Sequence, residues 1–503
     1  MKQMKQMITV LSLLLFITVT GNSQNLNGLD GIDSFIDSTM KQWSVPGVAI
    51  AVIKDGMVIY EKGYGYRNLK TKEKVTTQTL FSIASSSKAF TATLAAMVVE
   101  EKKMDFDTPL KEYFPEFRMY DEYATGHISL RDLLTHRSGI PRQKFFSLNT
   151  PPTRKNVRHC FRYFEPSANL GTRFQYCNET YSIAGDMIAE RAGTSWEEMI
   201  KKRIFKPLGM NSTLLSVSEV VKTSDYSLPY IDWAGGKPEE MDFHDADILG
   251  PAGCIISNVT DLSKWIIFNL NRGKNQDKQL VNPALLFQTQ TPQINISRSM
   301  AYKELFYQSY GMGWFINNYR GYVQINHGGV LYGFSSMVSF LPYEKIGVVV
   351  LTNLNGTPLT EIIERYVYDK MLGLSTIDWN DRFMKETARS MELYRNTLNQ
   401  KDPGYLPDTK PSHPLREYTG TFKSDGYGVL KIVAVGDSLS TTLLSFKCPL
   451  RHYNYDVFDI YHPVERQSWK IKFVSDLTGS INSLTINIGE GLKEIVYNRI
   501  ERN

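Results

Sequence analysis

The sequence predicts a mixed α/β domain followed by a small all-β barrel or sandwich. Across residues 25–373, segments with helical periodicity alternate with hydrophobic runs typical of antiparallel strands. A charged amphipathic helix and a proline-rich stretch follow at 374–410, and from about Leu415 the pattern contains only strands. We therefore expect domains at 24–373 and 411–503, with the segment 374–410 as a helix and linker between them.

The segment 1–23 is typical of a secretory signal peptide. Lys2 and Lys5 precede an apolar run from Ile8 to Val19, and a small polar cluster, TGNSQ, follows. The run is short for a membrane span, and no cysteine follows it that could carry a lipid. We expect an exported protein, periplasmic or secreted, without a stable membrane anchor.

The first domain contains clear local signals for both kinds of element. Strands are indicated at 45–68, around a Lys-Asp-Gly hairpin turn, and at 333–353, around a proline-containing turn. The segment 85–101 is apolar on nearly every face, which predicts a buried helix. Other helices are predicted at 34–43, at 128–142 and at 179–193.

The C-terminal region contains at least six short runs with the composition of strands, separated by turn signals. They lie at 428–435, 438–444, 455–461, 468–474, 483–488 and 494–500. This spacing favours a small barrel or sandwich.

Composition excludes several classes of function. The formal net charge is +5, removal of Lys2 and Lys5 leaves +3, and no dense Lys/Arg stripe occurs, so nucleic-acid binding is not expected. Four cysteines are too few for a disulfide scaffold, and Cys160 and Cys177 either pair or remain free thiols. No metal-ligand spacing is present, so we expect no metal and no cofactor.

The stretch FSIASSSKAF combines four serines with one lysine, Lys88. On a helix, residues three apart are neighbours about 60° apart, whereas residues one or two apart diverge by about 100° and 160°. This geometry excludes Ser87 and Ser86 as partners of Lys88 and selects Ser85. Apolar surroundings lower a lysine pKa from its usual value of about 10.4, so that the amine can act as a base.

An alternative interpretation of the S-x-x-K pattern stays open. Ser85 and Lys88 are also consistent with a serine N-cap followed by a surface lysine. A second copy of the pattern, Ser38–Lys41, is interpreted as an exposed helix face.

A tyrosine in a suitable loop is the second element of the candidate chemistry. Tyr176 and Asn178 form a Y-x-N pattern in a loop just before a predicted helix, where functional residues are often placed. The same pattern occurs at Tyr66–Asn68 in a hairpin and at Tyr394–Asn396 on the linker helix. Each copy taken alone is more often structural.

The third element is His327-Gly328-Gly329, between two predicted strands. Glycines at a strand edge let backbone N–H groups approach a ligand, as an oxyanion hole requires. A turn with an incidental histidine is the alternative. His136 is interpreted as a structural residue that closes a helix before Gly139.

These three motifs, in this order, resemble those of the serine β-lactamase and penicillin-binding superfamily. The similarity is to the class C β-lactamase-like branch, which includes esterases, D-aminopeptidases and D-alanyl-D-alanine carboxypeptidases. It covers about residues 30–370 and includes FSIASSSKAFTA, ISLRDLLTHRSGIP, FQYCNETYSIAGDMIAERAG, IFKPLGM, GPAGCIISNVTDLSKW and NHGGVLYGFSSMVSFLP. The resemblance implies an antiparallel sheet with helices on both faces beside an all-helical lobe. The segment LREYTGTFKSDGYGVLKI resembles an appended lipocalin-like β-domain.

The resemblance also implies a role for each motif residue. Ser85 would be the acylated nucleophile, Lys88 its activator, and Tyr176 the partner in proton transfer to and from the leaving group. Which of the two takes the serine proton stays open. Asn178 would orient Lys88 and the substrate amide. The backbone N–H groups of Ser85 and of Val330, directly after Gly329, would form the oxyanion hole.

One departure from the family pattern affects the expected substrate. Many relatives carry Lys-Thr-Gly as the third motif, whereas this chain has His327 in place of the lysine. A neutral imidazole holds a substrate carboxylate less firmly than an ammonium does. We therefore expect a peptidase or esterase acting on a small-molecule or peptide substrate rather than an efficient β-lactamase. The alternative is a non-hydrolytic penicillin-binding or ligand-sensing protein. The C-terminal domain would cap the cleft, bind a partner or support a homo-oligomer.

Overall fold

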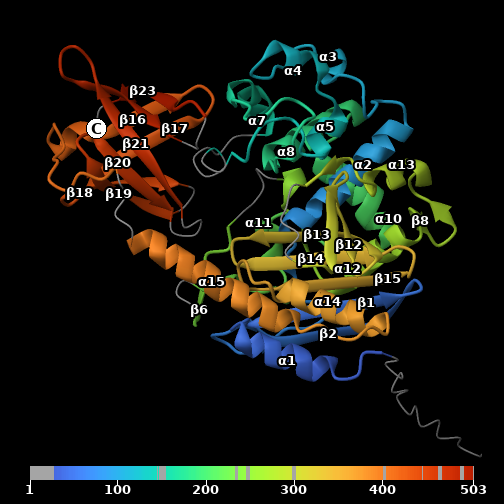
Figure 1. Cartoon of the computed structure of the whole chain (residues 1–503). Helices are drawn as coiled ribbons and strands as arrows, with labels where there is room; N and C mark the ends of the chain where they lie inside the picture. The colour runs from blue at the N-terminus through green and yellow to red at the C-terminus, as the bar shows by residue number, and fades with distance from the viewer. Residues whose placement is uncertain are drawn as a thin grey trace, which may run out of the picture.

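A computed structural model describes residues 28–143, 146, 154–232, 236–244, 250–296, 302–399, 404–443, 446–462, 467–487 and 492–501. The chain forms an α/β domain with a nine-stranded antiparallel sheet, followed by a closed eight-stranded barrel (Figure 1). The predicted fold class is confirmed, and of the two predicted forms of the second domain the structure has the barrel. The predicted signal peptide at 1–23 lies outside the described residues.

The large sheet is built from both ends of the first domain. In spatial order its strands are β10 (Ile294–Asn295), β11 (Leu305–Tyr310), β12 (Phe315–Tyr319), β13 (Tyr322–Leu331), β14 (Phe334–Leu341), β15 (Ile346–Thr352), β1 (Gly47–Lys54), β2 (Met57–Asn68) and β3 (Glu73–Lys74). β1 pairs with β2 through the predicted hairpin and with β15 on its other edge. The N-terminal hairpin and β3 therefore complete a sheet whose other six strands come from the last part of the domain.

Helices account for much of the rest of the first domain. They are α1 (Ile32–Gln42), α2 (Lys88–Glu100), α3 (Leu110–Tyr113), α4 (Glu122–His127), α5 (Leu130–Leu134), α7 (Arg154–Cys160), α8 (Asn178–Ala192), α9 (Trp196–Ile200), α10 (Lys206–Leu208), α11 (Val217–Val220), α12 (Val259–Leu270), α13 (Pro283–Thr289), α14 (Leu359–Met371) and α15 (Trp379–Asn399). Short paired strands, β4 (Phe81–Ser82) with β7 (Ile256–Ser257), β5 (Tyr230–Asp232) with β6 (Pro238–Glu240), and β8 (Lys274–Asn275) with β9 (Lys278–Gln279), lie between them.

The sheet is covered on both faces, as Figure 1 shows. Along β1, Val48 and Ile50 pack into one hydrophobic cluster with residues of α1 and α14, while Ala49 and Ala51 pack into the other with residues of α2 and α12. Successive strand residues point to opposite faces, so burial of both faces explains why β1 is an uninterrupted hydrophobic run. The helices α3, α4, α5, α7 and α8 form a lobe at one end of this body, with α2 leading into it.

The second domain is a closed barrel of consecutive antiparallel strands. They are β16 (Gly420–Ser424), β17 (Gly428–Val435), β18 (Ser438–Leu443), β19 (Phe446–Asn454), β20 (Val457–His462), β21 (Gln467–Ser475), β22 (Ile481–Ile486) and β23 (Ile495–Glu501). Six of the eight coincide with the predicted runs. β16 and β19 were not predicted: β16 is short, and β19 contains Pro449, a residue that disfavours strands.

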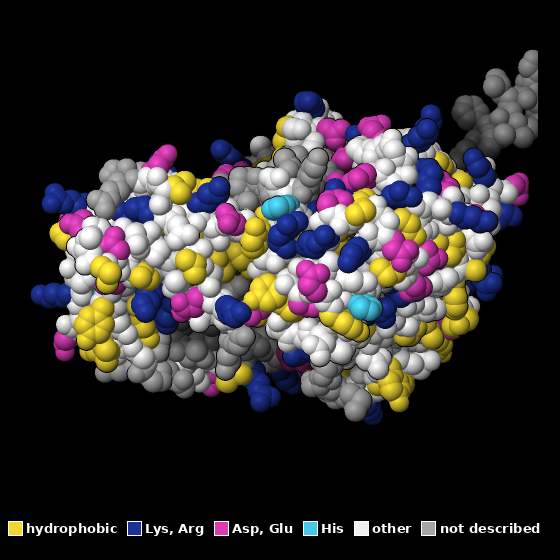
Figure 2. Space-filling model, turned by 90° about the horizontal axis from the view of Figure 1, so that it is seen from above, with side chains coloured by type: hydrophobic (Ala, Val, Ile, Leu, Met, Phe, Trp, Pro, Cys, Tyr) yellow, Lys and Arg dark blue, Asp and Glu magenta, His cyan; other side chains and the backbone are white. Residues whose placement is uncertain are grey.

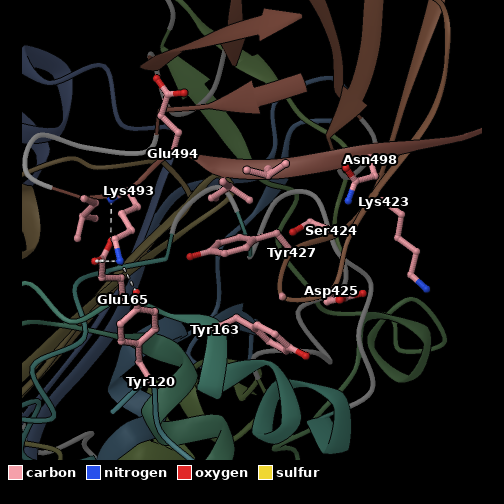
Figure 3. A pocket seen from close by; sticks show the side chains of 14 residues that line it. Tyr120, Tyr163, Glu165, Lys423, Ser424, Asp425, Tyr427, Lys493, Glu494 and Asn498 are labelled. Carbon is pink, nitrogen blue, oxygen red and sulfur yellow. Dashed lines mark hydrogen bonds and ion pairs between the residues drawn. The ribbon is translucent and has the colours of Figure 1, made fainter. Parts of the chain in front are cut away.

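The barrel contacts the helical lobe through a polar and aromatic junction. The Tyr427 hydroxyl donates to Gln143 Oε1 at 3.0 Å, and the Lys493 backbone N–H donates to Glu165 Oε2 at 2.7 Å. Lys493 Nζ donates to the Tyr120 hydroxyl at 2.9 Å. Figure 3 shows Tyr120, Glu165, Tyr427 and Lys493 around a cavity of about 330 Å³ between the two domains. The barrel therefore packs against the helical lobe.

A second contact joins the barrel to the sheet side of the first domain. The ring of Phe446, at the start of β19, lies 4.8 Å from the ring of His244 and 6.5 Å from that of Tyr332. Tyr332 directly follows β13, the strand that carries His327. One barrel hairpin thus reaches the turn at the end of the H-G-G strand.

The predicted linker helix packs against the first domain at its start. Trp379, the first residue of α15, is buried, and its Nε1 donates to the Tyr319 hydroxyl at 3.1 Å. From there α15 runs toward the barrel (Figure 1). No helix among the described residues is long and apolar enough to cross a membrane. Figure 2 shows positive and negative side chains interspersed over the face in view.

Candidate active site

Ser85 lies in a sharp turn at the start of the buried helix α2. A short 3₁₀ helix, Ala84–Ser87, runs directly into α2. Ala84 has a φ of +46°, a left-handed conformation that is uncommon for a residue with a side chain. The turn presents Ser85 at the helix N-terminus and brings its Oγ to 3.0 Å from Lys88 Nζ. This is the three-residue relation that the helical geometry predicts.

The two serines after Ser85 have structural partners. Ser86 Oγ donates to the carbonyl of His327 at 2.8 Å, and Ser87 Oγ accepts the N–H of Ile255 at 3.2 Å. Both side chains are buried. These bonds attach the turn that carries Ser85 to β13 and to the segment before β7.

Lys88 is fully buried and is held by three oxygen atoms. Its Nζ lies 3.0 Å from Ser85 Oγ, 2.9 Å from Asn178 Oδ1 and 2.7 Å from the carbonyl oxygen of Ala252. Burial, assisted by the positive charge of Arg142, holds the pKa of the amine well below its ordinary value. An amine that loses its proton more easily can accept the proton of a neighbouring hydroxyl.

Tyr176 lies above the amine, in the loop that leads into α8. Lys88 Nζ is 4.9 Å from the centroid of the Tyr176 ring. Burial raises the pKa of Tyr176, and its hydrogen bond with Ser85 offsets part of that rise. The phenol therefore stays protonated and can donate a proton within the site. Asn178, two residues later, is the first residue of α8 and bonds to Lys88 from there.

His327 faces the site from β13 as a neutral imidazole. Burial and the nearby Lys88 lower its pKa to about 3. Its Nδ1 lies 2.6 Å from the carbonyl oxygen of Gly328, and its Nε2 lies 3.1 Å from the Tyr310 hydroxyl. A carbonyl only accepts, so Nδ1 carries the hydrogen and Nε2 accepts from Tyr310. The residue that replaces the family lysine thus brings no positive charge at neutral pH.

The H-G-G strand approaches the turn that carries Ser85 closely at Gly329. A Cβ on Gly329 would lie 2.2 Å from the carbonyl oxygen of Ile83 and 2.9 Å from the backbone nitrogen of Ser85. Only glycine fits at this distance. Val330 follows and is 54% exposed. The strand therefore lies beside the Ser85 N–H, and the participation of the Val330 N–H in an oxyanion hole stays a prediction.

His136, interpreted from the sequence as structural, lies beside Tyr176, and Tyr310 is a neighbour that the sequence reasoning did not single out. His136 is fully buried, and its ring lies 4.3 Å from that of Tyr176. Its Nδ1 accepts the N–H of Cys177 at 3.2 Å, and its carbonyl accepts the N–H of Gln175 at 2.7 Å. The expected structural role is thus located: His136 holds the Tyr176 loop. Neither periodicity nor spacing indicated this contact or that of Tyr310.

The competing motif copies lie elsewhere in the fold. Ser38 and Lys41 are exposed on α1, Tyr66 lies in β2, and Tyr394 lies in α15. All four cysteines are buried free thiols, so Cys160 and Cys177 do not pair. Among the described residues, no group of three or more His, Cys, Asp or Glu is arranged to hold a metal ion.

Comparison with known families and proteins gives consistent matches along the chain. The family model Beta-lactamase matches residues 32–370, and the model Domain of unknown function (DUF3471) matches residues 406–498. The unguisins hydrolase ungD of Aspergillus violaceofuscus is 28% identical over 442 residues, covering 80% of this chain and 76% of its own length. Protein flp of Staphylococcus aureus is 28% identical over 374 residues, covering 73% of this chain and 70% of its own.

A solved structure supports the fold over both domains. The octameric penicillin-binding protein homologue from Pyrococcus abyssi superposes with a TM-score of 0.61 at 24% identity. The match covers 93% of this chain and 99% of that one. At this identity the likeness concerns the fold, including the presence of a second domain.

Proposed function

Because the chain belongs to the beta-lactamase family, we propose that it is an exported serine hydrolase that cleaves amide or ester bonds through an acyl-enzyme on Ser85. The observation that carries the proposal is the 3.0 Å contact between Ser85 Oγ and the buried amine of Lys88. A hydroxyl next to an amine of lowered pKa is the arrangement that activates a serine nucleophile. The two relatives named as unguisins hydrolases favour the same class of activity.

The two pKa shifts favour different roles for Lys88 and Tyr176 in proton transfer. The pKa of Lys88 is lowered, which suits a base, whereas that of Tyr176 is raised, which suits a proton donor. Ser85 Oγ attacks the carbonyl carbon while its proton passes to Lys88. The bond to the leaving group breaks as that group takes the Tyr176 proton, which the Lys88 ammonium replaces. Water then attacks the acyl carbon while its proton passes to Lys88, and the bond to Ser85 breaks as Ser85 Oγ takes that proton back.

The neutral His327 favours substrates without a carboxylate at the position that the family lysine grips. An ammonium forms charge-assisted hydrogen bonds with a carboxylate, and a neutral ring does not. We therefore propose peptides, including those with D-amino acids, and esters as the substrate class, with β-lactams as poorer substrates.

Intact-protein mass spectrometry with an activated ester and a β-lactam probe tests the nucleophile. The wild type and Ser38→Ala should gain the acyl mass, because Ser38 belongs to the exposed second copy of the motif. Ser85→Ala should gain none. Equal labelling of Ser85→Ala would refute the assignment. Lasting acylation without turnover on ester, D-peptide and β-lactam substrates would instead favour a penicillin-binding or sensing protein.

The exported location is tested separately. The proposed signal peptide predicts that the protein recovered outside the cytoplasm begins near residue 24. N-terminal sequencing checks this, and an intact N-terminus in the recovered protein would contradict it.

A further inference from the structure

Two segments of the first domain, 136–143 and 164–177, lie side by side, and the second carries Tyr176. Three main-chain hydrogen bonds join them: the N–H groups of Gln175, Gly171 and Ser167 donate to the carbonyls of His136, Arg137 and Gly139 at 2.7, 2.8 and 3.0 Å. A Cβ on Gly139 would lie 2.2 Å from the carbonyl oxygen of Ala168, so the two backbones are in direct contact. We call these two ranges the paired segments.

The first of the paired segments ends at a hydrogen bond from the barrel. The Tyr427 hydroxyl donates to Gln143 Oε1 at 3.0 Å, and Gln143 Nε2 donates to the carbonyl of Pro141 at 3.0 Å. Gln143 and Tyr427 are both buried. Loss of the hydroxyl would therefore remove a buried donor from Gln143, and such a loss disturbs the surrounding structure more than the loss of an exposed bond.

The same tyrosine contacts the start of the second segment. The ring centroid of Tyr427 lies 5.4 Å from that of Phe164. The neighbouring Gly426 lets the barrel turn come close, because a Cβ there would lie 2.4 Å from the Cβ of Tyr163. Figure 3 shows Tyr427 and Tyr163 where the two domains meet. Tyr427 thus contacts both of the paired segments at one end, while His136 joins them at the other, beside Tyr176.

The first of the paired segments also carries a charge that acts on the site. Arg142 lies between Pro141 and Gln143 and is exposed. Burial lowers the pKa of Lys88 and raises that of Tyr176, and the charge of Arg142 lowers the pKa of both. A displacement of Gln143 would therefore change the electrostatic surroundings of both groups, because the effect of a charge depends on its distance.

We propose that Tyr427 is a positioning residue, which holds the paired segments together through Gln143 and thereby keeps Tyr176 in place beside Ser85 and Lys88. The C-terminal domain is then part of the structure that supports the active site, although it supplies none of the reacting groups. The effect on catalysis rests on the proposed function. The effect on the paired segments does not depend on any activity.

Hydrogen–deuterium exchange, read by mass spectrometry of peptides that cover 164–177, tests the effect on the paired segments without a substrate. In Tyr427→Phe the amides of this range should exchange about fivefold faster or more, because their main-chain bonds open more readily. Tyr418→Phe is the matched control, since it removes a hydroxyl that donates to Asp456 within the C-terminal domain. Equal exchange of 164–177 in the two variants would overturn the proposal.

Steady-state kinetics on a neutral ester test the effect on catalysis. Tyr427→Phe should lower kcat at least about threefold and change KM less, because Tyr176 moves a proton in the proposed mechanism. Tyr418→Phe should keep the kcat of the wild type. An unchanged kcat in Tyr427→Phe would overturn the positioning role. Absence of turnover in the wild type would refute the proposed function instead, and the exchange experiment would still decide whether Tyr427 holds the paired segments.

A substitution on the other side of the contact provides a second test, which also serves if Tyr427→Phe does not fold. Gln143→Met removes the acceptor and retains a side chain of similar length. It should change exchange and kcat in the same direction as Tyr427→Phe. Adding Tyr427→Phe to Gln143→Met should change neither quantity further, because both substitutions break the same contact. Additive effects would show that Tyr427 acts by another route and would overturn the proposal.

Discussion

Lys88 Nζ lies 3.0 Å from Ser85 Oγ, and Lys88 itself is fully buried. The amine is therefore shielded from water by the same packing that positions the hydroxyl. This one contact joins the position of the proposed nucleophile to the protonation state of its proposed base.

The activity should depend on pH through Lys88. The pKa of this amine is lowered, and the base must be neutral, so activity should fall as the pH drops through that lowered pKa. Arg142→Gln removes a charge that lowers the pKa of Lys88, so this pKa should rise. The fall of activity at low pH should then begin at a higher pH than in the wild type. Measurements of kcat/KM for a neutral ester as a function of pH check this, with Arg416→Gln in the C-terminal domain as the control. An unmoved limb in Arg142→Gln would contradict the prediction.

His136 should control the Tyr176 loop. His136→Phe leaves the buried N–H of Cys177 without an acceptor, which should cost about 1–3 kcal/mol of unfolding free energy and lower kcat. His136→Asn should retain more of both, because asparagine supplies an acceptor and tolerates the φ of +57° found here. Denaturant unfolding and steady-state kinetics measure the two effects. Equal behaviour of the two variants would exclude a positioning role.

The charge at position 327 should set the preference for carboxylates. His327→Lys places an ammonium where the wild type has a neutral imidazole. We expect kcat/KM for a carboxylate-bearing β-lactam, relative to that for a neutral ester, to rise about tenfold or more. The same ratio measured for Tyr310→Phe serves as the control, since that change removes a partner of His327 without adding charge. A constant ratio in His327→Lys would show that substrate carboxylates bind elsewhere.

The barrel should stabilise the lobe through Tyr427. Tyr427→Phe removes the hydroxyl that donates to Gln143, which should lower the free energy of unfolding by about 1 kcal/mol. Tyr455→Phe, at an exposed position of the barrel, should cost almost nothing. Denaturant unfolding of the full chain compares them. Identical midpoints for the two variants would mean that the junction does not contribute to stability.

Glu364 should make the folded state less stable as the pH rises. Its pKa is raised from 4.5 to about 7, so the folded state binds the proton more tightly, and stability is lost between these two values. Glu364→Gln cannot ionise. Its free energy of unfolding, relative to that of the wild type, should therefore rise by about 3 kcal/mol between pH 4 and pH 8. Unfolding free energies at several pH values test this.

Local patterns determined much of the fold and part of the site. The hairpin at β1 and β2, the helices α2 and α8 and six barrel strands follow from residues close together in the sequence. Ser85 could be chosen over Ser86 and Ser87 because helical spacing is a local property. The positive φ of Ala84 and the buried bonds of Ser86 and Ser87 could not be foreseen, because they depend on β13 and on the segment before β7.

The residues missed by the sequence reasoning make their contacts across the fold. His136 touches Tyr176 and Tyr310 only because the helical lobe closes against the sheet edge. Trp379 begins a charged helix that has the composition of a linker, yet it is buried under α14 and β12 by tertiary packing. Such contacts have no counterpart in periodicity or local composition, so they could not be predicted from the sequence.

The pairing of β1 with β15 has a consequence for biosynthesis. Ser85 and Lys88 are translated early, but the sheet that supports them closes only when residues 346–352 pair with the first strand. The H-G-G strand, which borders the nucleophile turn, also comes from this late part of the chain. A nascent or truncated chain that ends before β13 therefore carries the nucleophile without its completed surroundings. The proposed hydrolytic activity should therefore arise only after most of the first domain has been synthesised.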